Sequence, residues 1–239
     1  QTRHFLDAGQ GGWFHNLLAA QTPADFRAIV ESPWFHDLLS LSSHDETRPI
    51  VALMDNAKAA ARLEALLETF GGPTSSVAGD DLGERTQLPF KQYRGVAALR
   101  AADSTGRMIE STVTRAERAR KELPALHEKH RGWMSTRDGN FDADLLAMSR
   151  FTSDPKGPLA LVFCNLRNDG AREDVFKLDV DAAKRIDPDK QYNVRDLMAD
   201  DPKAKLWPDA VSGRDLLEHG VFARVPAYGL QILSVEEAR

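Results

Sequence analysis

The sequence predicts a parallel α/β segment followed by an all-β module. In the first half of the chain, short apolar runs alternate with stretches of helical periodicity, which is the pattern of βα units. In the second half, short strand-like segments recur at regular intervals between Pro, Gly and Asp residues. The 239 residues, 42% of them hydrophobic and 28% charged, are enough for one large domain or two small domains.

The first helix is expected over residues 23–31. Thr22 is a suitable N-cap, Pro23 suits the first helical position, and Asp25 complements the positive end of the helix dipole. The short apolar run at residues 38–41 is interpreted as a buried strand, although periodicity over so few residues is also compatible with a helix.

A long amphipathic helix is expected from Pro49 to Phe70. Apolar residues recur there at helical spacing, and Gly71-Gly72-Pro73 supplies a stop. The apolar face consists of Val51, Met54, Ala57, Ala61, Leu63, Leu66 and Leu67. The small-residue segment 74–84 is a candidate second strand, and a second long helix is expected over residues 111–130.

Six segments of the second half have strand character: residues 145–151, 159–163, 175–180, 192–197, 221–225 and 230–235. The segment 165–170 contains the dipeptide Asp169-Gly170 after Asn168, which predicts a hairpin-type turn. Regularly spaced short strands indicate an antiparallel β-sandwich. Because the helical pattern ends near residues 131–142, we expect one domain over residues 1–135 and the sandwich over residues 136–239.

The first half does not contain enough βα units for a closed parallel sheet. A parallel strand needs neighbours on both sides and helices on both faces, and two βα units cannot supply these. The first residue is Gln1, and the opening residues show neither the charged start nor the apolar stretch of a signal peptide. We therefore expect this chain to be a piece of a longer protein or to have lost an upstream segment.

Two groups of polar residues follow the predicted strands. His44 and Asp45 come after the first strand, and Asp80 and Asp81 come after the second. In parallel α/β folds the catalytic residues lie at the carboxyl ends of strands, where acids can bind sugar hydroxyls or stabilise an oxocarbenium-like transition state. A purely structural interpretation remains open, since acids ahead of a helix, such as Asp45 and Glu46, also cap it and complement its dipole.

Composition and charge disfavour several other functions. A formal charge of −5, without a basic cluster that contains aromatic residues, argues against a nucleic-acid partner. No apolar run approaches the ~20 residues that a membrane-spanning helix needs. The single cysteine, Cys164, excludes an intrachain disulfide and slightly favours a reducing compartment such as the cytoplasm. His127 and His130 lack further ligands at metal spacing, so we expect neither a metal nor a cofactor.

Four segments, in this order, resemble the α-amylase superfamily of (β/α)₈-barrel glycosidases and transglycosidases. The resemblance lies in SLSSHDETR, GGPTSSVAGDDLGE, RARKELPAL and the terminal strands with YNVRDL and VPAYGLQIL. They are similar to the family's Asn-His-Asp strand end, its following Gly-x-Glu-x-Gly strand, its last barrel helix and its C-terminal sandwich. The resemblance implies a partial TIM barrel, with the last two or three βα units, followed by an antiparallel β-sandwich.

The resemblance also implies roles for two residues. Asp45 corresponds to the third catalytic carboxylate, which stabilises the transition state, and His44 corresponds to a substrate-binding histidine beside the cleaved bond. Two departures are evident, because Ser43 stands where the family usually has Asn and Asp81 stands where it usually has Glu. Arg48 has no assured counterpart, and we interpret it as a surface or helix-start residue.

No segment before residue 38 resembles those that carry the family's nucleophilic Asp and acid/base Glu. The resemblance therefore implies the C-terminal part of a retaining enzyme that acts on α-glucans, maltooligosaccharides or related α-glucosides. It also implies that the missing N-terminal barrel portion is a partner and that this chain alone is inactive. The alternative is a non-catalytic carbohydrate-binding or subunit-interaction module.

Overall fold

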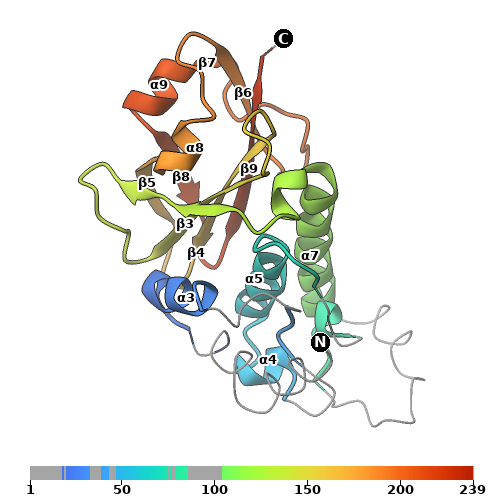
Figure 1. Cartoon of the computed structure of the whole chain (residues 1–239). Coiled ribbons are helices and arrows are strands. Elements are labelled where there is room, and N and C mark those ends of the chain that lie inside the picture. The colour runs from blue at the N-terminus through green and yellow to red at the C-terminus, as the bar shows by residue number, and fades with distance from the viewer. Residues whose placement is uncertain are drawn as a thin grey trace.

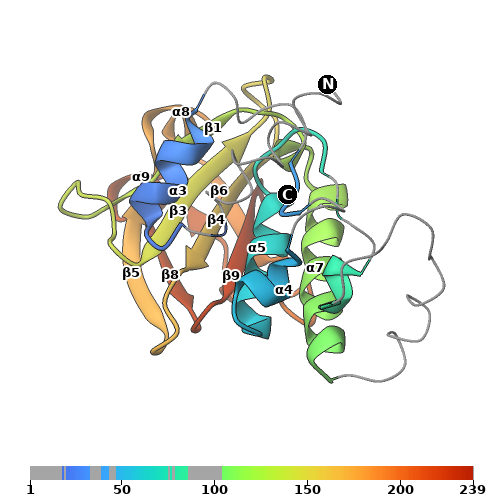
Figure 2. The same ribbon diagram turned by 90° about the horizontal axis from the view of Figure 1, so that it is seen from below.

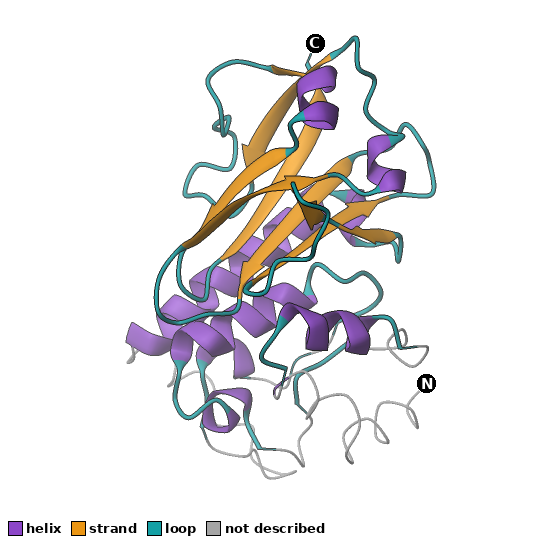
Figure 3. Cartoon of the chain, turned by 90° about the vertical axis from the view of Figure 1, so that its left-hand side faces the viewer, coloured by secondary structure: helices purple, strands orange, loops and turns teal. Residues whose placement is uncertain are grey.

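The structure is a computed structural model that describes the following parts of the chain: Leu18 and residues 20–32, 39–42, 47–74, 76, 79–85 and 104–238. Most of its helices lie along one side of a set of strands, and two short helices lie beside the strands at the far end (Figures 1 and 3). Within these described parts, no helix is both long enough and apolar enough to cross a membrane.

Helix α3 (Pro23–Val30) forms where the sequence predicts it. The Thr22 hydroxyl accepts a hydrogen bond from the backbone N–H of Asp25, and the Asp25 carboxylate accepts one from the backbone N–H of Thr22 at 2.9 Å. This reciprocal arrangement satisfies backbone donors that the first helical turn leaves without partners. Phe26 and Val30 are fully buried and hold the helix against the strands.

The long helix expected from Pro49 to Phe70 is two helices, so that prediction is wrong. α4 (Pro49–Ala52) ends at a tight turn in which Met54 and Asp55 have positive φ angles of 54° and 60°. α5 (Ala57–Leu67) then begins with Asn56 as its N-cap, whose side chain accepts a hydrogen bond from Ala59 N. Met54 was expected on the buried face but is 91% exposed.

The two segments predicted to be parallel strands form a single parallel β-bridge within the described residues. Leu39 and Thr74 form a single parallel bridge, and Leu39 N donates to Pro73 O at 2.9 Å. The described residues 39–42 are buried, as a strand interior would be, but they form no regular strand. The two chain segments therefore lie side by side and run in the same direction, as expected for neighbouring βα units.

The second long helix is α7 (Ser104–Glu122), which begins and ends earlier than the predicted residues 111–130. Pro124 ends it, because a proline has no backbone N–H, and a short 3₁₀ helix, η2 (Pro124–Leu126), follows. α7 lies beside α5 (Figure 2). Arg120 joins the two helices, because it donates to Glu68 O at 3.1 Å and to Gly72 O at 2.5 Å.

The second half forms two antiparallel sheets. The strands of the six-stranded sheet, in spatial order, are β1 (Arg131–Trp133), β3 (Leu145–Phe151), β4 (Leu159–Asn165), β9 (Leu230–Glu237), β6 (Gln191–Asp196) and β7 (Val211–Ser212). The three-stranded sheet consists of β2 (Ser135–Thr136), β5 (Arg172–Lys177) and β8 (Val221–Val225). Two short helices, α8 (Val180–Ala183) and α9 (Gly213–Glu218), complete this half.

All six predicted strands are therefore present, and their ends differ from the predicted ones by at most three residues. The segment expected at residues 175–180 ends as a strand at Lys177. The reason is Asp179, which caps α8 by accepting hydrogen bonds from Asp181 N and Ala182 N. Val180 consequently belongs to a helix and is exposed.

The six-stranded sheet separates two hydrophobic cores. Along β4, Ala160, Val162 and Cys164 pack toward the helices. The alternate residues Leu159, Leu161 and Phe163 pack into a second core that includes side chains of the three-stranded sheet. Because side chains of a strand point alternately to opposite faces, β4 is buried on both faces and its sequence is apolar throughout.

The hairpin predicted around Asn168 does not form. β4 and β5 belong to different sheets, so the residues between them carry the chain from one sheet to the other. Asn165, at the end of β4, is fully buried and holds this crossover. Its side-chain N–H groups donate to Gly170 O and Val225 O at 3.0 Å and to Pro226 O at 3.1 Å, while its carbonyl accepts from Arg167 N at 2.9 Å.

The crossover gives a test of the fold. Asn165→Ala leaves these backbone groups without their partner and should lower the free energy of unfolding by about 3 kcal/mol, measured by urea denaturation. Asn165→Asp should be at least as destabilising, because it places a carboxylate against carbonyl oxygens. Asn168→Ala, at an exposed position of the same loop, should change stability by less than about 0.5 kcal/mol. Equal stability of Asn165→Ala and wild type would contradict the assigned role.

Candidate functional site

The two residues singled out as catalytic and substrate-binding, Asp45 and His44, lie outside the described residues. So do their neighbours Ser43 and Glu46. The described residues on either side, Ser42 and Arg48 with Thr47, show how this part of the chain is held. The candidate site is therefore described through the residues on either side of the segment 43–46 and the side chains that they contact.

The carboxylate of Asp80 contacts a residue on each side of the segment 43–46. The Ser42 hydroxyl donates a hydrogen bond to one oxygen of Asp80, and Arg48 Nη1 lies 3.1 Å from the other. The exposed fractions of Ser42, Arg48 and Asp80 are 0%, 1% and 4%. Asp80 therefore connects the two flanks of the segment 43–46 in a site from which water is excluded.

Local backbone geometry brings Asp80 to this position. Asp80 begins the short 3₁₀ helix η1 (Asp80–Leu82), which lies between Gly79 and Gly83. These two glycines have φ angles of 97° and 66°, in the left-handed region that other residues rarely adopt. A Cβ atom at position 79 would also lie 2.9 Å from Arg48 Nη2, so glycine leaves room for the guanidinium.

A second buried acid comes from α5. Glu64 is 6% exposed, and burial raises the pKa of its carboxyl well above the ordinary value. The negative charges of Asp80 and Asp81 raise this pKa further, and the positive charge of Arg48 opposes them. The protonated form of Glu64 is therefore favoured in the folded chain.

These contacts revise two expectations from the sequence. Arg48 does precede a helix, since it is the N-cap residue of α4, but it is buried rather than at the surface. Asp80 was expected at the end of a strand, and it begins a 3₁₀ helix and contacts the side chains of Ser42 and Arg48. Asp81, the neighbour of Asp80, is only partly buried.

Glu64 was not recognised as part of this site from the sequence. Its spacing in α5 is ordinary for a helix, and a glutamate there is usually solvated. The only local signal is that its helix neighbours are apolar on nearly every side, which is typical of a helix that is buried all round. In the described part of the chain, no three or more His, Cys, Asp or Glu side chains form a group that could hold a metal ion.

Sequence comparisons with protein-family models and with curated proteins give no match. Solved structures do match. An α-amylase from Geobacillus thermoleovorans, complexed with acarbose, is 14% identical and has a TM-score of 0.63, with 100% of this chain and 52% of that chain covered. An α-amylase from H. orenii is 13% identical with a TM-score of 0.59, and the match covers 95% of this chain and 48% of that one.

A trehalulose synthase from Pseudomonas mesoacidophila MX-45 also matches, at 16% identity and a TM-score of 0.53. This match covers 91% of the present chain and 47% of the synthase. The chain thus spans about half the length of the structures that it resembles. It shares the fold of about half of each of these enzymes, in agreement with the resemblance that the sequence motifs suggested.

Proposed function

We propose that this chain is the C-terminal part of a retaining glycoside hydrolase or transglycosidase that acts on α-glucans or related α-glucosides. The observation that carries the proposal is the match of the whole chain to half of an α-amylase structure. A further match, the protein AmyP, has been solved in complex with maltose, which makes short α-glucans the natural ligands to test.

Two further parts of the proposal concern architecture. Residues 1–135 would contribute the last βα units of a (β/α)₈ barrel, and residues 136–239 would form its antiparallel β-sandwich. The parallel bridge between Leu39 and Thr74 supports the first part. The core shared by the six-stranded and three-stranded sheets supports the second. The strands needed to close the barrel would come from a segment outside these 239 residues.

Asp45 is the proposed transition-state stabiliser, and His44 the proposed sugar-binding residue. Both belong to the segment 43–46 between Ser42 and Arg48, which are the two residues that contact Asp80. A carboxylate can bind hydroxyls of a sugar and stabilise positive charge that develops on its ring. Fixed flanks would reduce the entropy that the segment loses when it binds a sugar.

Bond cleavage needs two more carboxyl groups. Retaining chemistry uses a nucleophile and a general acid about 5 Å apart, and both would belong to the remainder of the proposed barrel. The chain by itself would therefore bind a sugar weakly and leave its glycosidic bonds intact.

The proposed role of Asp45 predicts how sugar binding responds to substitution. The purified chain should show no turnover of maltooligosaccharides, and Asp45→Asn should weaken their binding about tenfold in calorimetric titrations, because a charge-assisted hydrogen bond is lost. Glu46→Gln is the matched control. It removes a neighbouring negative charge that could complement a helix dipole as well as Asp45 could, but that has no proposed role in sugar binding. Efficient turnover by the chain alone would refute the proposal that the other two carboxyl groups lie elsewhere. Sugar binding that is indifferent to Asp45 would favour a non-catalytic module.

The buried ion pair gives a second prediction. Arg48→Met and Asp80→Asn should each lower the free energy of unfolding by about 3 kcal/mol or more, because each leaves the partner charge buried. The double variant should lose much less than the sum of the two. Lys184→Met breaks an exposed pair with Asp181 and should cost less than about 1 kcal/mol. Additive losses in the double variant would show that Arg48 and Asp80 do not stabilise each other.

Glu64 predicts a pH dependence of stability. A carboxyl whose pKa is higher in the folded state than in the unfolded state stabilises the fold fully below the unfolded pKa. That stability is lost as the pH rises from the unfolded value toward the raised folded value. Glu64→Gln should therefore be close to wild type at pH 4 and more stable than wild type at pH 8, measured by thermal unfolding. Glu110→Gln, at a less buried position on α7, should show no such difference.

A further inference from the structure

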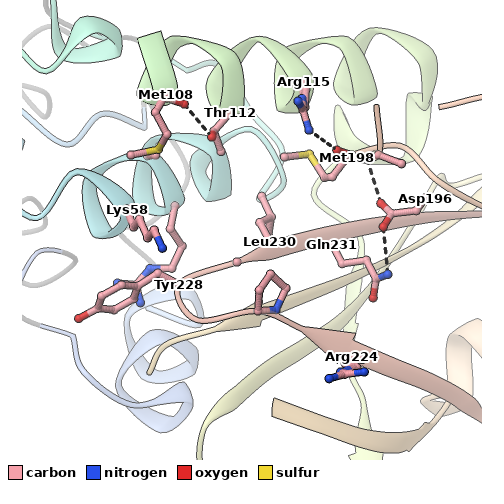
Figure 4. Close-up of a pocket in the computed structure, with 15 residues that line it drawn as sticks. Lys58, Met108, Thr112, Arg115, Asp196, Met198, Arg224, Tyr228, Leu230 and Gln231 are labelled. Carbon is pink, nitrogen blue, oxygen red and sulfur yellow. Dashed lines mark hydrogen bonds between the residues drawn. The ribbon is translucent and has the colours of Figure 1, made fainter. Parts of the chain in front are cut away.

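A cavity of about 330 Å³ lies between the helices and the sheets (Figure 4). Its walls come from α5, α7, the end of β6 and the residues after it, the end of β8 and the start of β9. None of its lining residues belongs to the cluster of Ser42, Arg48, Glu64 and Asp80. This cavity, here called the interlayer cavity, is therefore separate from the candidate site described above.

Four cationic side chains line the interlayer cavity, and they differ in their partners. Arg115 lies 2.8 Å from a carboxylate oxygen of Asp200, and Arg224 lies 3.3 Å from one of Glu173. Lys58 and Arg62, one helical turn apart on α5, have no acidic partner within the described residues. The cavity therefore has a cationic end whose charge is not neutralised by those residues.

Arg62 is the more informative of these two cations. It is 5% exposed, and its Nε and Nη1 groups have no hydrogen-bond partner among the described residues. Its guanidinium lies 4.8 Å from the centroid of the Tyr228 ring, which orients it without satisfying its N–H groups. A guanidinium stays protonated, so burial without acceptors is unfavourable unless a ligand supplies them.

The opposite end of the cavity offers hydrogen-bond acceptors. Lys58 and Tyr228 lie on one side of Leu230, and Asp196 and Gln231 lie on the other (Figure 4). Gln231 donates to Asp196 at 3.0 Å through its side-chain N–H, and its carbonyl oxygen is buried without a partner in the described structure. An unpaired acceptor of this kind suits the hydroxyl hydrogens of a ligand.

We propose that the interlayer cavity binds a phosphate group, carried by a small phosphorylated polyol or sugar. The phosphate oxygens would accept hydrogen bonds from Arg62 and Lys58, the two cations without acidic partners. Hydroxyl groups would donate to the Gln231 carbonyl oxygen, and Leu230 would contact the carbon skeleton. The cavity volume exceeds what a phosphate ion alone requires, which is why an ester is the expected form.

The proposal is tested by titrating the whole chain with three probes: glucose 6-phosphate, inorganic phosphate and uncharged glucose. We expect glucose 6-phosphate to bind saturably, inorganic phosphate to bind about tenfold more weakly, and glucose not to bind. Binding should weaken as NaCl is raised, because the contacts are ionic. Equal affinities for the ester and inorganic phosphate would assign the site to free phosphate.

Substitutions of the lining residues test which of them bind the phosphate group. Lys58→Gln, at an exposed position, should weaken both phosphate probes about tenfold without affecting the fold. Arg62→Met should abolish binding, with circular dichroism checking that the variant is folded. Gln231→Leu should weaken only glucose 6-phosphate. Lys156→Gln removes an exposed lysine that does not line the cavity and is the matched control. Absence of saturable phosphate binding to wild type, or equal binding by Lys58→Gln and Lys156→Gln, would overturn the proposal.

Discussion

Burial of charge is the constraint on which the described structure most depends. Arg48, Arg62, Glu64, Asp80 and Arg150 are all at most 6% exposed. A charge removed from water is strongly destabilising when nothing replaces the lost hydration. Arg48 and Asp80 form an ion pair, burial favours the protonated form of Glu64, and two N–H groups of Arg62 have no acceptor among the described residues. For Arg150, burial lowers the pKa to about 9, and the side chain donates to the backbone carbonyl of Glu128.

Helix α5 places two of these groups on different sides of itself. Arg62 and Glu64 are two positions apart, and residues so spaced do not share a helix face. Both are nevertheless buried, because α5 is covered on nearly every side by α7, the six-stranded sheet and the segment around η1. One face of α5 thus contributes to the cluster around Asp80, and another lines the interlayer cavity. A single helix connects the proposed glycosidase site to the proposed phosphate site without their sharing a lining residue.

The six-stranded sheet supplies the rigid element on which the helices rest. Its β3 and β4 strands are buried along their whole length, since helices cover one face and the three-stranded sheet covers the other. Interiors of this kind are close-packed and resist displacement of one layer relative to another. Arg120 of α7 holds the two helices together by donating hydrogen bonds to backbone carbonyl groups at and just after the end of α5. The chain segments beside the proposed catalytic residues are therefore attached to a well-packed base.

The sequence by itself determined the local elements whose signals are local. The cap at Thr22 predicted α3, and apolar segments predicted all six strands, because helix capping and the alternation of side chains along a strand depend on neighbours in the sequence. The motif order also pointed to the fold that the solved structures share with this chain. Asn56 is a favourable N-cap residue and could have indicated the start of α5, but the apolar spacing from Pro49 to Phe70 predicted one continuous helix instead. Only the tertiary structure decided that the turn near Asn168 joins two sheets, that Asp80 connects Ser42 to Arg48, and that Arg62 lines a cavity. The physical reason is that partners distant in the chain set these features, and burial of a charged side chain depends on what packs over it.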